Sequence, residues 1–214
     1  MHSVYIFDFD GTLVDSMPSW AEKVLNILQE AGVAYPADVV HIVTPLGDRG
    51  TAEYFRDVLG VSLSVEEIFS RMDAHALPKY RDEIPLKAGV KEYLARARAT
   101  GHTLHVLTAS PHKMVDPCLK RLGIFDWFDN VWSTDDFGMV KSDPHIYSAA
   151  AQRIGADVSE TVFFDDNLAA VRTAARAGMY TVGVYDASGD AYVSEIQAAA
   201  DRYVYTLSEL PDHL

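Results

Sequence analysis

Two aspartates near the start of the chain, Asp8 and Asp10, follow directly after the apolar run Val4-Tyr5-Ile6-Phe7. In a strand, alternate side chains point the same way, so both carboxylates would face one side and Phe9 the other. Two carboxylates there could hold a hard cation, and Gly11 would let the backbone approach an anion closely. Because Asp-Gly is also a common turn pair, the motif alone leaves an acidic turn without a ligand as an alternative.

A second acidic pair, Asp165-Asp166, ends another apolar run, Thr161-Val162-Phe163-Phe164. The carboxyl ends of the strands in an open α/β sheet form one ligand-binding edge, so we expect this pair at the same edge as Asp8. Adjacent carboxylates repel each other, and two of them at a strand end are explained if a cation lies between them. Asp166 could equally cap a helix beginning at Leu168, which is compatible with metal binding.

Two further residues at such positions could hold an anion. Thr108 ends an apolar run and, with Ala109, precedes a helical pattern, which places a hydroxyl and backbone N–H groups where an anion can bind. Lys141 lies in a loop before another helical pattern, where an ammonium could neutralise phosphate charge. Taken singly, both are weak indications, because such residues are usually a helix cap and a solvated charge.

The apolar pattern along the chain alternates between short buried strands and amphipathic helices. We expect strands at Val4–Phe9, Thr103–Thr108, Val131–Ser133, Thr161–Phe164 and Tyr180–Val184, and helices at Val90–Ala99, His112–Leu122, His145–Ile154 and Leu168–Ala177. The strands lack polar alternation, as expected when both faces of a parallel sheet are covered. This order predicts an α/β fold with a doubly wound parallel sheet.

One long segment interrupts the alternation. Residues 16–85 carry helical signals and no strong strand, and the sequence Ser64-Val65-Glu66-Glu67 is a capping box that opens a helix. A loop of that length without structure would be improbable in a compact domain. We therefore expect a core domain made of residues 1–15 and 86–214, with residues 16–85 forming a small inserted helical domain.

Composition excludes several classes of protein. The 214 residues carry a formal net charge of −13, which disfavours binding to nucleic acid or to an anionic membrane. Cys118 is the sole cysteine, so no internal disulfide can form, and we expect it to be buried. The apolar runs are too short to span a membrane, and no signal peptide precedes Val4, so we expect a cytoplasmic protein without an obligate protein partner.

The order of the motifs resembles that of the haloacid dehalogenase superfamily. Asp8-Phe9-Asp10-Gly11-Thr12, a threonine at a strand end, a lysine in a loop and Asp165-Asp166 occur in sequence across the chain. The residues from Phe163 to Val184 look most like the phosphatase and β-phosphoglucomutase branch. The resemblance implies a Rossmann-like core with an inserted helical cap, Mg²⁺ as cofactor and a small phosphorylated metabolite as substrate.

The resemblance also implies a role for each matching residue. Asp8 would be the nucleophile that forms an aspartyl-phosphate, and Asp10 would be the general acid and then the general base. Mg²⁺ would be bound by Asp8, the backbone carbonyl of Asp10 and Asp166, with Asp165 close behind them. The phosphoryl group would be held by Gly11, Thr12, Thr108, Ala109 and Lys141, and candidate substrate contacts are Arg49 and His112.

Three alternatives to a phosphatase follow from the same resemblance. Dehalogenases of this fold lack the second acid, whereas Asp10 is present here. A sugar-phosphate mutase of the β-phosphoglucomutase type shares every core motif, but its cap histidine has no counterpart between Asp15 and Trp20. A non-catalytic phosphate-binding module is disfavoured by the complete set of catalytic residues. We therefore expect a Mg²⁺-dependent phosphatase, with the mutase as the alternative.

Overall fold

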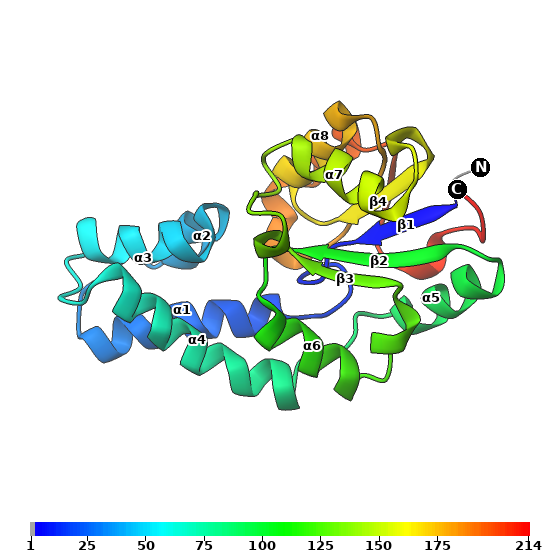
Figure 1. The fold of residues 1–214 in the computed structure, drawn as a ribbon. Coiled ribbons are helices and arrows are strands. Elements are labelled where there is room, and N and C mark those ends of the chain that lie inside the picture. Colours follow the sequence, from blue (N-terminus) through cyan, green and yellow to red (C-terminus); the bar gives the residue numbers. More distant parts are fainter. Residues whose placement is uncertain (1–2) are drawn as a thin grey trace. The chain divides into compact units, whose positions relative to one another are not determined.

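The computed structural model describes residues 3–214, apart from the side chain of Pro45. The chain divides into two compact units, one made of Met1–Asp15 with Pro85–Leu214 and the other of Ser16–Ile84. The first unit contains a β-sheet with helices, and the second is helical (Figure 1).

The α/β unit is built on a six-stranded parallel sheet with the strand order β3-β2-β1-β4-β5-β6. Its strands are β1 (Val4–Phe7), β2 (Thr103–Thr108), β3 (Asn130–Ser133), β4 (Thr161–Asp165), β5 (Tyr180–Val184) and β6 (Arg202–Val204). The chain adds strands outward on one side of β1 and then on the other. The expected doubly wound parallel sheet is confirmed, and β1 and β4 flank the point where the strand order reverses.

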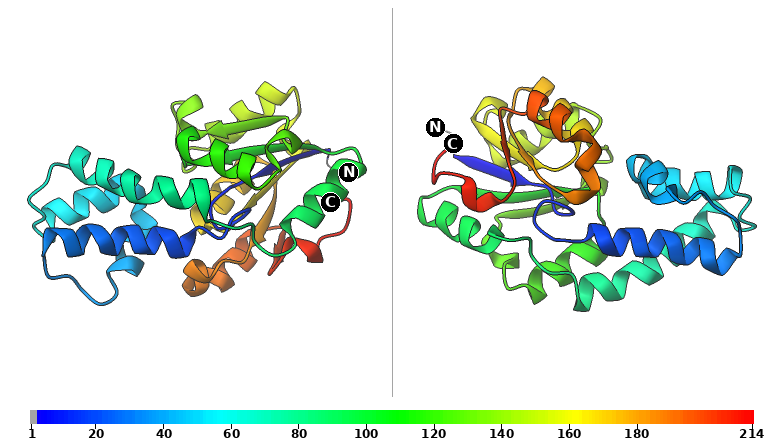
Figure 2. Two further views of the ribbon diagram at one scale, coloured as in Figure 1. Left: turned by 90° about the horizontal axis from the view of Figure 1, so that it is seen from below. Right: turned by 180° about the vertical axis from the view of Figure 1, so that it is seen from behind.

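Helices cover both faces of this sheet (Figures 1 and 2). On one face lie α5 (Val90–Ala99) and α6 (His112–Arg121), and on the other lie α7 (His145–Ile154) and α8 (Leu168–Ala177), with α9 (Val193–Ala199) packed beside α8. Right-handed crossovers require this arrangement, because a reversal in the direction of strand addition moves the connecting helices to the opposite face. Short 3₁₀ helices occupy Phe125–Trp127, Thr134–Asp136, Val158–Glu160, Ala187–Tyr192 and Leu207–Glu209.

The core of the α/β unit explains why its central strands are apolar at every position. All four residues of β1 are buried, since helices cover both faces. Phe7 pairs in register with Phe164 of β4, and their rings stack with centroids 4.3 Å apart. Full burial of such a ring contributes about 1.5–3 kcal/mol. Cys118 is also buried, as expected.

The strand boundaries differ from expectation at the site. β1 ends at Phe7, two residues earlier than expected, because the chain then turns back on itself. The N–H groups of Leu13 and Val14 both donate to the carbonyl of Phe9, at 2.9 and 3.0 Å. Asp8 and Asp10 therefore lie at the mouth of a tight loop that directly follows the strand.

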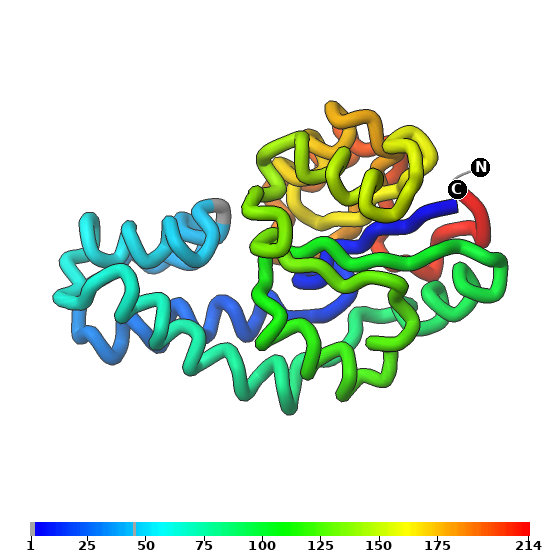
Figure 3. The backbone as a smooth tube through the Cα atoms, viewed as in Figure 1, coloured from blue at the N-terminus to red at the C-terminus, as the bar shows by residue number. Residues whose placement is uncertain are grey.

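The helical unit contains four α-helices (Figure 3). These are α1 (Met17–Ala31), α2 (Val39–Val43), α3 (Gly47–Asp57) and α4 (Val65–Asp82), with a 3₁₀ turn at Thr44–Leu46. The expected capping box is confirmed, since Ser64 accepts from the N–H of Glu67 and Glu67 accepts from the N–H of Ser64. An apolar cluster that includes Val24, Phe55 and Ile68 holds the helices together.

Candidate active site

Asp8 lies at the carboxyl end of the central strand. Its N–H donates to the carbonyl of Phe164 at 2.8 Å, which continues the ladder between β1 and β4 by one residue. Its side chain is buried and accepts a hydrogen bond from the ammonium of Lys141. The same ammonium donates to Asp165 Oδ2 at 2.8 Å, so one lysine bridges two carboxylates at the carboxyl ends of neighbouring strands.

The loop between β3 and α7 places Lys141 there. The Tyr147 hydroxyl, from the first turn of α7, lies 2.9 Å from the Lys141 carbonyl and 3.2 Å from the Ala170 carbonyl, and the two carbonyls share its one hydrogen as acceptors. The Lys141 Nζ lies 5.5 Å from the centroid of the Phe163 ring. Tyr147 therefore fixes the backbone of the loop at Lys141, and the lysine is a largely buried charge rather than a solvated one.

The electrostatics of the site show an excess of negative charge. Burial, together with Asp165 and Asp10, outweighs Lys141 and raises the pKa of Asp8 to about 7. Burial, Asp165 and Asp8 raise the pKa of Asp166 well above its usual range. Burial opposes the charge of Lys141, yet the two carboxylates beside it outweigh burial and raise its pKa. One ammonium does not neutralise these acids.

The acidic groups fit a divalent cation. Asp8, Asp165 and Asp166 can each offer one carboxylate oxygen, and these oxygens lie within 4.8 Å of one another. Both oxygens of Asp165 are already bonded, one to Lys141 and the other to the N–H of Asn167 at 2.7 Å. Asp8 and Asp166 are therefore better placed to bind a metal directly. A hard cation with oxygen ligands, such as Mg²⁺, suits this donor set.

Gly11 allows the loop to approach Asp166. Its φ of +75° lies in the left-handed region, and a Cβ there would lie 2.5 Å from Asp166 Oδ2. The next residue uses this approach, since the hydroxyl of Thr12 donates to Asp166 Oδ1 at 3.0 Å. The glycine is therefore required both by the backbone conformation and by the carboxylate against it.

The loop after β2 brings a hydroxyl to Asp10. Ser110 Oγ donates to Asp10 Oδ2 at 2.5 Å, and its N–H donates to Thr108 Oγ at 3.1 Å. Thr108 is buried and Ala109 is exposed at this turn. Sequence reasoning included Thr108 and Ala109 but assigned no role to Ser110. The Asp10–Ser110 bond joins positions 100 residues apart in the chain, and no local pattern signals it.

Sequence reasoning also gave no indication of a second lysine beside the site, Lys87, whose side chain is largely buried. Lys87 donates to the carbonyl of Gly11 at 2.5 Å, to the carbonyl of Tyr185 at 2.6 Å and to Asp186 Oδ2 at 2.8 Å. Its position, in a loop before α5, resembles that of any solvated lysine in the sequence. Its partner Asp186 has a local role as well, because its side chain caps the following turn by accepting from the N–H of Ser188.

The alternative role considered for Asp166, as cap of the next helix, is wrong. Asn167 occupies that position, and its side-chain oxygen accepts from the N–H groups of Ala169 and Ala170 at 2.9 and 3.2 Å. A residue immediately before the first helical residue can accept these bonds, whereas Asp166 lies one position too early. The carboxylate of Asp166 is therefore turned to Thr12 instead.

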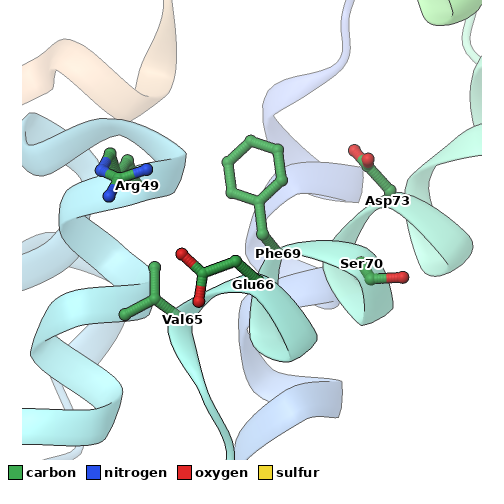
Figure 4. A pocket seen from close by; sticks show the side chains of 6 residues that line it. All are labelled: Arg49, Val65, Glu66, Phe69, Ser70 and Asp73. Carbon is green, nitrogen blue, oxygen red and sulfur yellow. The ribbon is translucent and has the colours of Figure 1, made fainter.

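The two candidate substrate contacts lie in different units. Arg49, near the start of α3, forms an ion pair with Glu53 and lines a pocket of about 300 Å³ on the helical unit (Figure 4). Phe69 also lines this pocket, together with Val65, Glu66, Ser70 and Asp73. His112 bonds Asp116 and Asp136 through its two ring nitrogens, and these bonds raise its pKa. Both residues remain predictions as substrate contacts.

The described residues include no helix that is both long and apolar enough to cross a lipid bilayer.

Comparison with known proteins identifies the family. The haloacid dehalogenase-like hydrolases match residues 2–178. The chain is 32% identical over 184 residues to the putative phosphatase YhcW of Bacillus subtilis, covering 85% of this chain and 83% of that protein. It is 29% identical to validoxylamine A 7'-phosphate phosphatase of Streptomyces hygroscopicus subsp. limoneus, covering 98% of this chain and 96% of that protein.

Solved structures share the fold. The crystal structure of CbbY from Rhodobacter sphaeroides in complex with phosphate superposes with a TM-score of 0.84 at 22% identity, covering 98% of this chain and 96% of that one. That similarity concerns the fold alone. The sequence matches show that the chain belongs to the haloacid dehalogenase-like hydrolase family, as an enzyme of the phosphoric monoester hydrolase class.

Proposed function

We propose that the protein is a Mg²⁺-dependent phosphatase that hydrolyses a small phosphorylated metabolite through an aspartyl-phosphate on Asp8. The observation that carries this proposal is the buried carboxylate of Asp8, bonded to Lys141 at the carboxyl end of the central strand and close to Asp166. A carboxylate nucleophile, a fixed ammonium and a second carboxylate for a metal are the parts that covalent phosphoryl transfer needs.

In the first step, an oxygen of Asp8 attacks the phosphorus, and the bond from phosphorus to the substrate oxygen breaks. Asp10 donates its proton to the leaving alkoxide, and Ser110 holds its carboxyl group in place. In the second step, Asp10 takes a proton from water, whose oxygen attacks the phosphorus and releases inorganic phosphate and free Asp8. The division of one displacement into two is the usual gain from covalent catalysis.

Attack of one anion on another requires positive charge at the site. Lys141 supplies one charge and would contact the phosphoryl oxygens together with the Thr108 hydroxyl and the backbone N–H groups of Gly11, Thr12 and Ala109. Mg²⁺, held by Asp8, Asp166 and the Asp10 carbonyl, would offset the remaining repulsion between nucleophile and phosphate. Burial and the neighbouring carboxylates raise the pKa of Asp8. The positive charges of Lys141 and Mg²⁺ would oppose this effect and favour ionised Asp8 at neutral pH.

The names of the relatives support a small phosphorylated substrate. One is a phosphatase of validoxylamine A 7'-phosphate, and others are named as phosphatases of hexitols and of phosphorylated carbohydrates. We propose that residues 16–84 form the cap that selects the leaving group, with Arg49 among its substrate contacts. The pocket beside Arg49 combines a cation, an aromatic ring and two carboxylates, which suits a polar organic group.

Phosphate release from a panel of sugar phosphates, polyol phosphates, phosphoglycolate and nucleotides tests the proposal. Activity should require Mg²⁺, disappear with a chelator and return when Mg²⁺ is added. Acid quenching during turnover should trap a phosphorylated peptide that contains Asp8, and Asp8→Asn should yield none. Full activity in a chelator, or turnover by Asp8→Asn equal to that of the wild type, would refute the mechanism.

The same assay separates a phosphatase from a mutase, which shares every core motif. A mutase must exclude water from the aspartyl-phosphate long enough to transfer the phosphoryl group to a sugar hydroxyl. The segment between Asp15 and Trp20 has no histidine to orient such a sugar. We expect stoichiometric phosphate release without a bisphosphate activator. Conversion of β-glucose 1-phosphate to glucose 6-phosphate much faster than phosphate release would identify a mutase instead.

A further inference from the structure

The largely buried ammonium of Lys87 joins the loop that contains Gly11 to the segment that follows β5. The three hydrogens of the ammonium match three acceptors: the carbonyls of Gly11 and Tyr185 and the carboxylate of Asp186. The side chain is 16% exposed, and that of Asp186 is 6% exposed. A lysine with this many bonds at this burial has one position, so whatever it bonds is held in place.

The bond to Gly11 acts on the catalytic loop. The Gly11 carbonyl and the Thr12 N–H belong to one planar peptide group, so a donor that holds the carbonyl also sets the direction of the N–H. The two residues of this peptide also meet Asp166: the Thr12 hydroxyl bonds it, and a Cβ on Gly11 would collide with the same carboxylate. The peptide that Lys87 holds therefore also contacts Asp166.

The backbone of Lys87 is anchored to the same loop. Its N–H donates to the Leu13 carbonyl at 3.0 Å, and the N–H of Asp15 donates to the Pro85 carbonyl at 3.0 Å. A β-bridge between Val14 and Leu86 lies between these two bonds. The loop is thus fixed at its end by the main chain around Lys87 and at its tip by the Lys87 side chain.

Asp186, which accepts from the Lys87 ammonium, is itself held in place. Asp186 Oδ1 accepts from the N–H and the hydroxyl of Ser188, at 3.0 and 2.7 Å, while Oδ2 accepts from Lys87. Burial opposes the charge of Asp186, but its bonds to Lys87 and Ser188 outweigh burial and lower its pKa. The carboxylate therefore gives Lys87 a fixed anionic partner that is not among the proposed ligands of the metal or the phosphoryl group.

We propose that Lys87 is a positioning residue that holds the Gly11–Thr12 peptide against Asp166 and thereby sets the affinity for Mg²⁺ and the rate of turnover. This inference rests on the proposed function for its kinetic part. Removal of such indirect partners of a metal site typically lowers metal affinity or activity about 10–100-fold. Lys87 is not among the groups proposed to bind the substrate directly, so we expect KM to change little.

Three variants separate positioning from stability. Lys87→Met removes the ammonium and leaves Asp186 buried without its partner, so a loss of stability is expected. The double variant Lys87→Met/Asp186→Asn removes both charges and should recover the thermal midpoint. Asp186→Asn alone is the matched control, because Lys87 keeps its bond to Gly11 there. Mg²⁺ affinity is measured by calorimetry, alongside kcat, KM and the thermal midpoint.

The expected pattern is a double variant with a recovered midpoint but with Mg²⁺ affinity and kcat still about tenfold or more below the wild type and KM within about twofold. Asp186→Asn should keep both quantities near the wild type. Recovery of Mg²⁺ affinity and kcat together with the midpoint would show that Lys87 is only structural and would overturn the inference. If the wild type binds Mg²⁺ but hydrolyses nothing, the proposed function fails, while the calorimetric comparison still decides the role of Lys87.

Discussion

Replacement of Gly11 by alanine tests whether the loop must lie against Asp166. Gly11 has a φ of +75°, and its added Cβ would lie 2.5 Å from Asp166 Oδ2 and 2.7 Å from Cγ. Gly123, in the same unit, has a φ of +71° and open space around its Cβ position. The two substitutions therefore share the backbone strain, and only Gly11→Ala displaces a carboxylate of the site.

The structure sets the size of both effects. A left-handed conformation costs an alanine about 1–2 kcal/mol, which applies to both variants. In Gly11→Ala, Asp166 must also move and lose its bond from Thr12, and a hydrogen bond to a charged group contributes about 1.5–3 kcal/mol. We expect the free energy of unfolding to fall by about 1–2 kcal/mol in Gly123→Ala and by about 2.5–5 kcal/mol in Gly11→Ala.

The assay combines chemical denaturation with Mg²⁺-binding calorimetry and phosphate release. Gly123→Ala should bind Mg²⁺ and turn over like the wild type at temperatures well below its unfolding transition. Gly11→Ala should lose Mg²⁺ affinity and turnover, because the displaced carboxylate is a proposed metal ligand. Equal Mg²⁺ affinity and turnover in the two variants would refute the conclusion that the close approach of Gly11 to Asp166 serves the site.

Three other expectations concern single side chains. Asp10→Asn should lower turnover of sugar phosphates about 10²–10⁴-fold but affect the first step with an aryl phosphate less, because an aryl oxide leaves without protonation. Lys141→Met should reduce the free energy of unfolding of the metal-free protein by about 3–5 kcal/mol in denaturant titrations, because Asp8 and Asp165 stay buried without their cation, and Mg²⁺ should recover part of the loss. Burial lowers the pKa of His105 from 6.5 to about 4, so the unfolded chain binds more protons between these values, and stability should fall as pH falls from about 6.5 to about 4, by up to roughly 3 kcal/mol.

Each of these has its own control. An equal, modest loss for both substrate types would give Asp10 a structural role only. An unchanged stability of Lys141→Met in chelator would mean that the two carboxylates are not held ionised by the lysine. His105→Phe should remove its share of the acid-induced loss in unfolding curves measured at several pH values. A pH dependence identical to that of the wild type would show that His105 is not responsible.

Local patterns predicted most of the architecture. The helices at Val90–Ala99, His145–Ile154 and Leu168–Ala177 begin and end as expected, because their apolar spacing and the glycine after two of them are local signals. Strands β1 to β5 were found because residues buried on both faces form short apolar runs, whereas β6 was not among the expected strands. The end of β1 was missed by two residues, since the turn after Phe7 depends on bonds back to Phe9 rather than on residue type.

The sequence by itself determined that Asp8, Thr108 and Asp165 would meet. All three end or directly follow parallel strands, and right-handed crossovers place such ends at one edge of the sheet. It also showed that Asp166 follows them and that Lys141 lies in a loop at the same edge. The topology of a doubly wound sheet brings these strand ends together, so their proximity can be predicted without knowing any side-chain contact.

Only the tertiary structure decided which partners these residues have. Lys141 divides its ammonium between Asp8 and Asp165, Ser110 bonds Asp10, and Lys87 reaches the carbonyl of Gly11 from 76 residues away. In the sequence these two lysines and this serine look like ordinary loop residues, because a bond between distant segments leaves no periodic pattern near either partner. Their roles arise from burial: the packed sheet and helices exclude water, and a charged or polar side chain must then bond whatever group the fold has placed beside it.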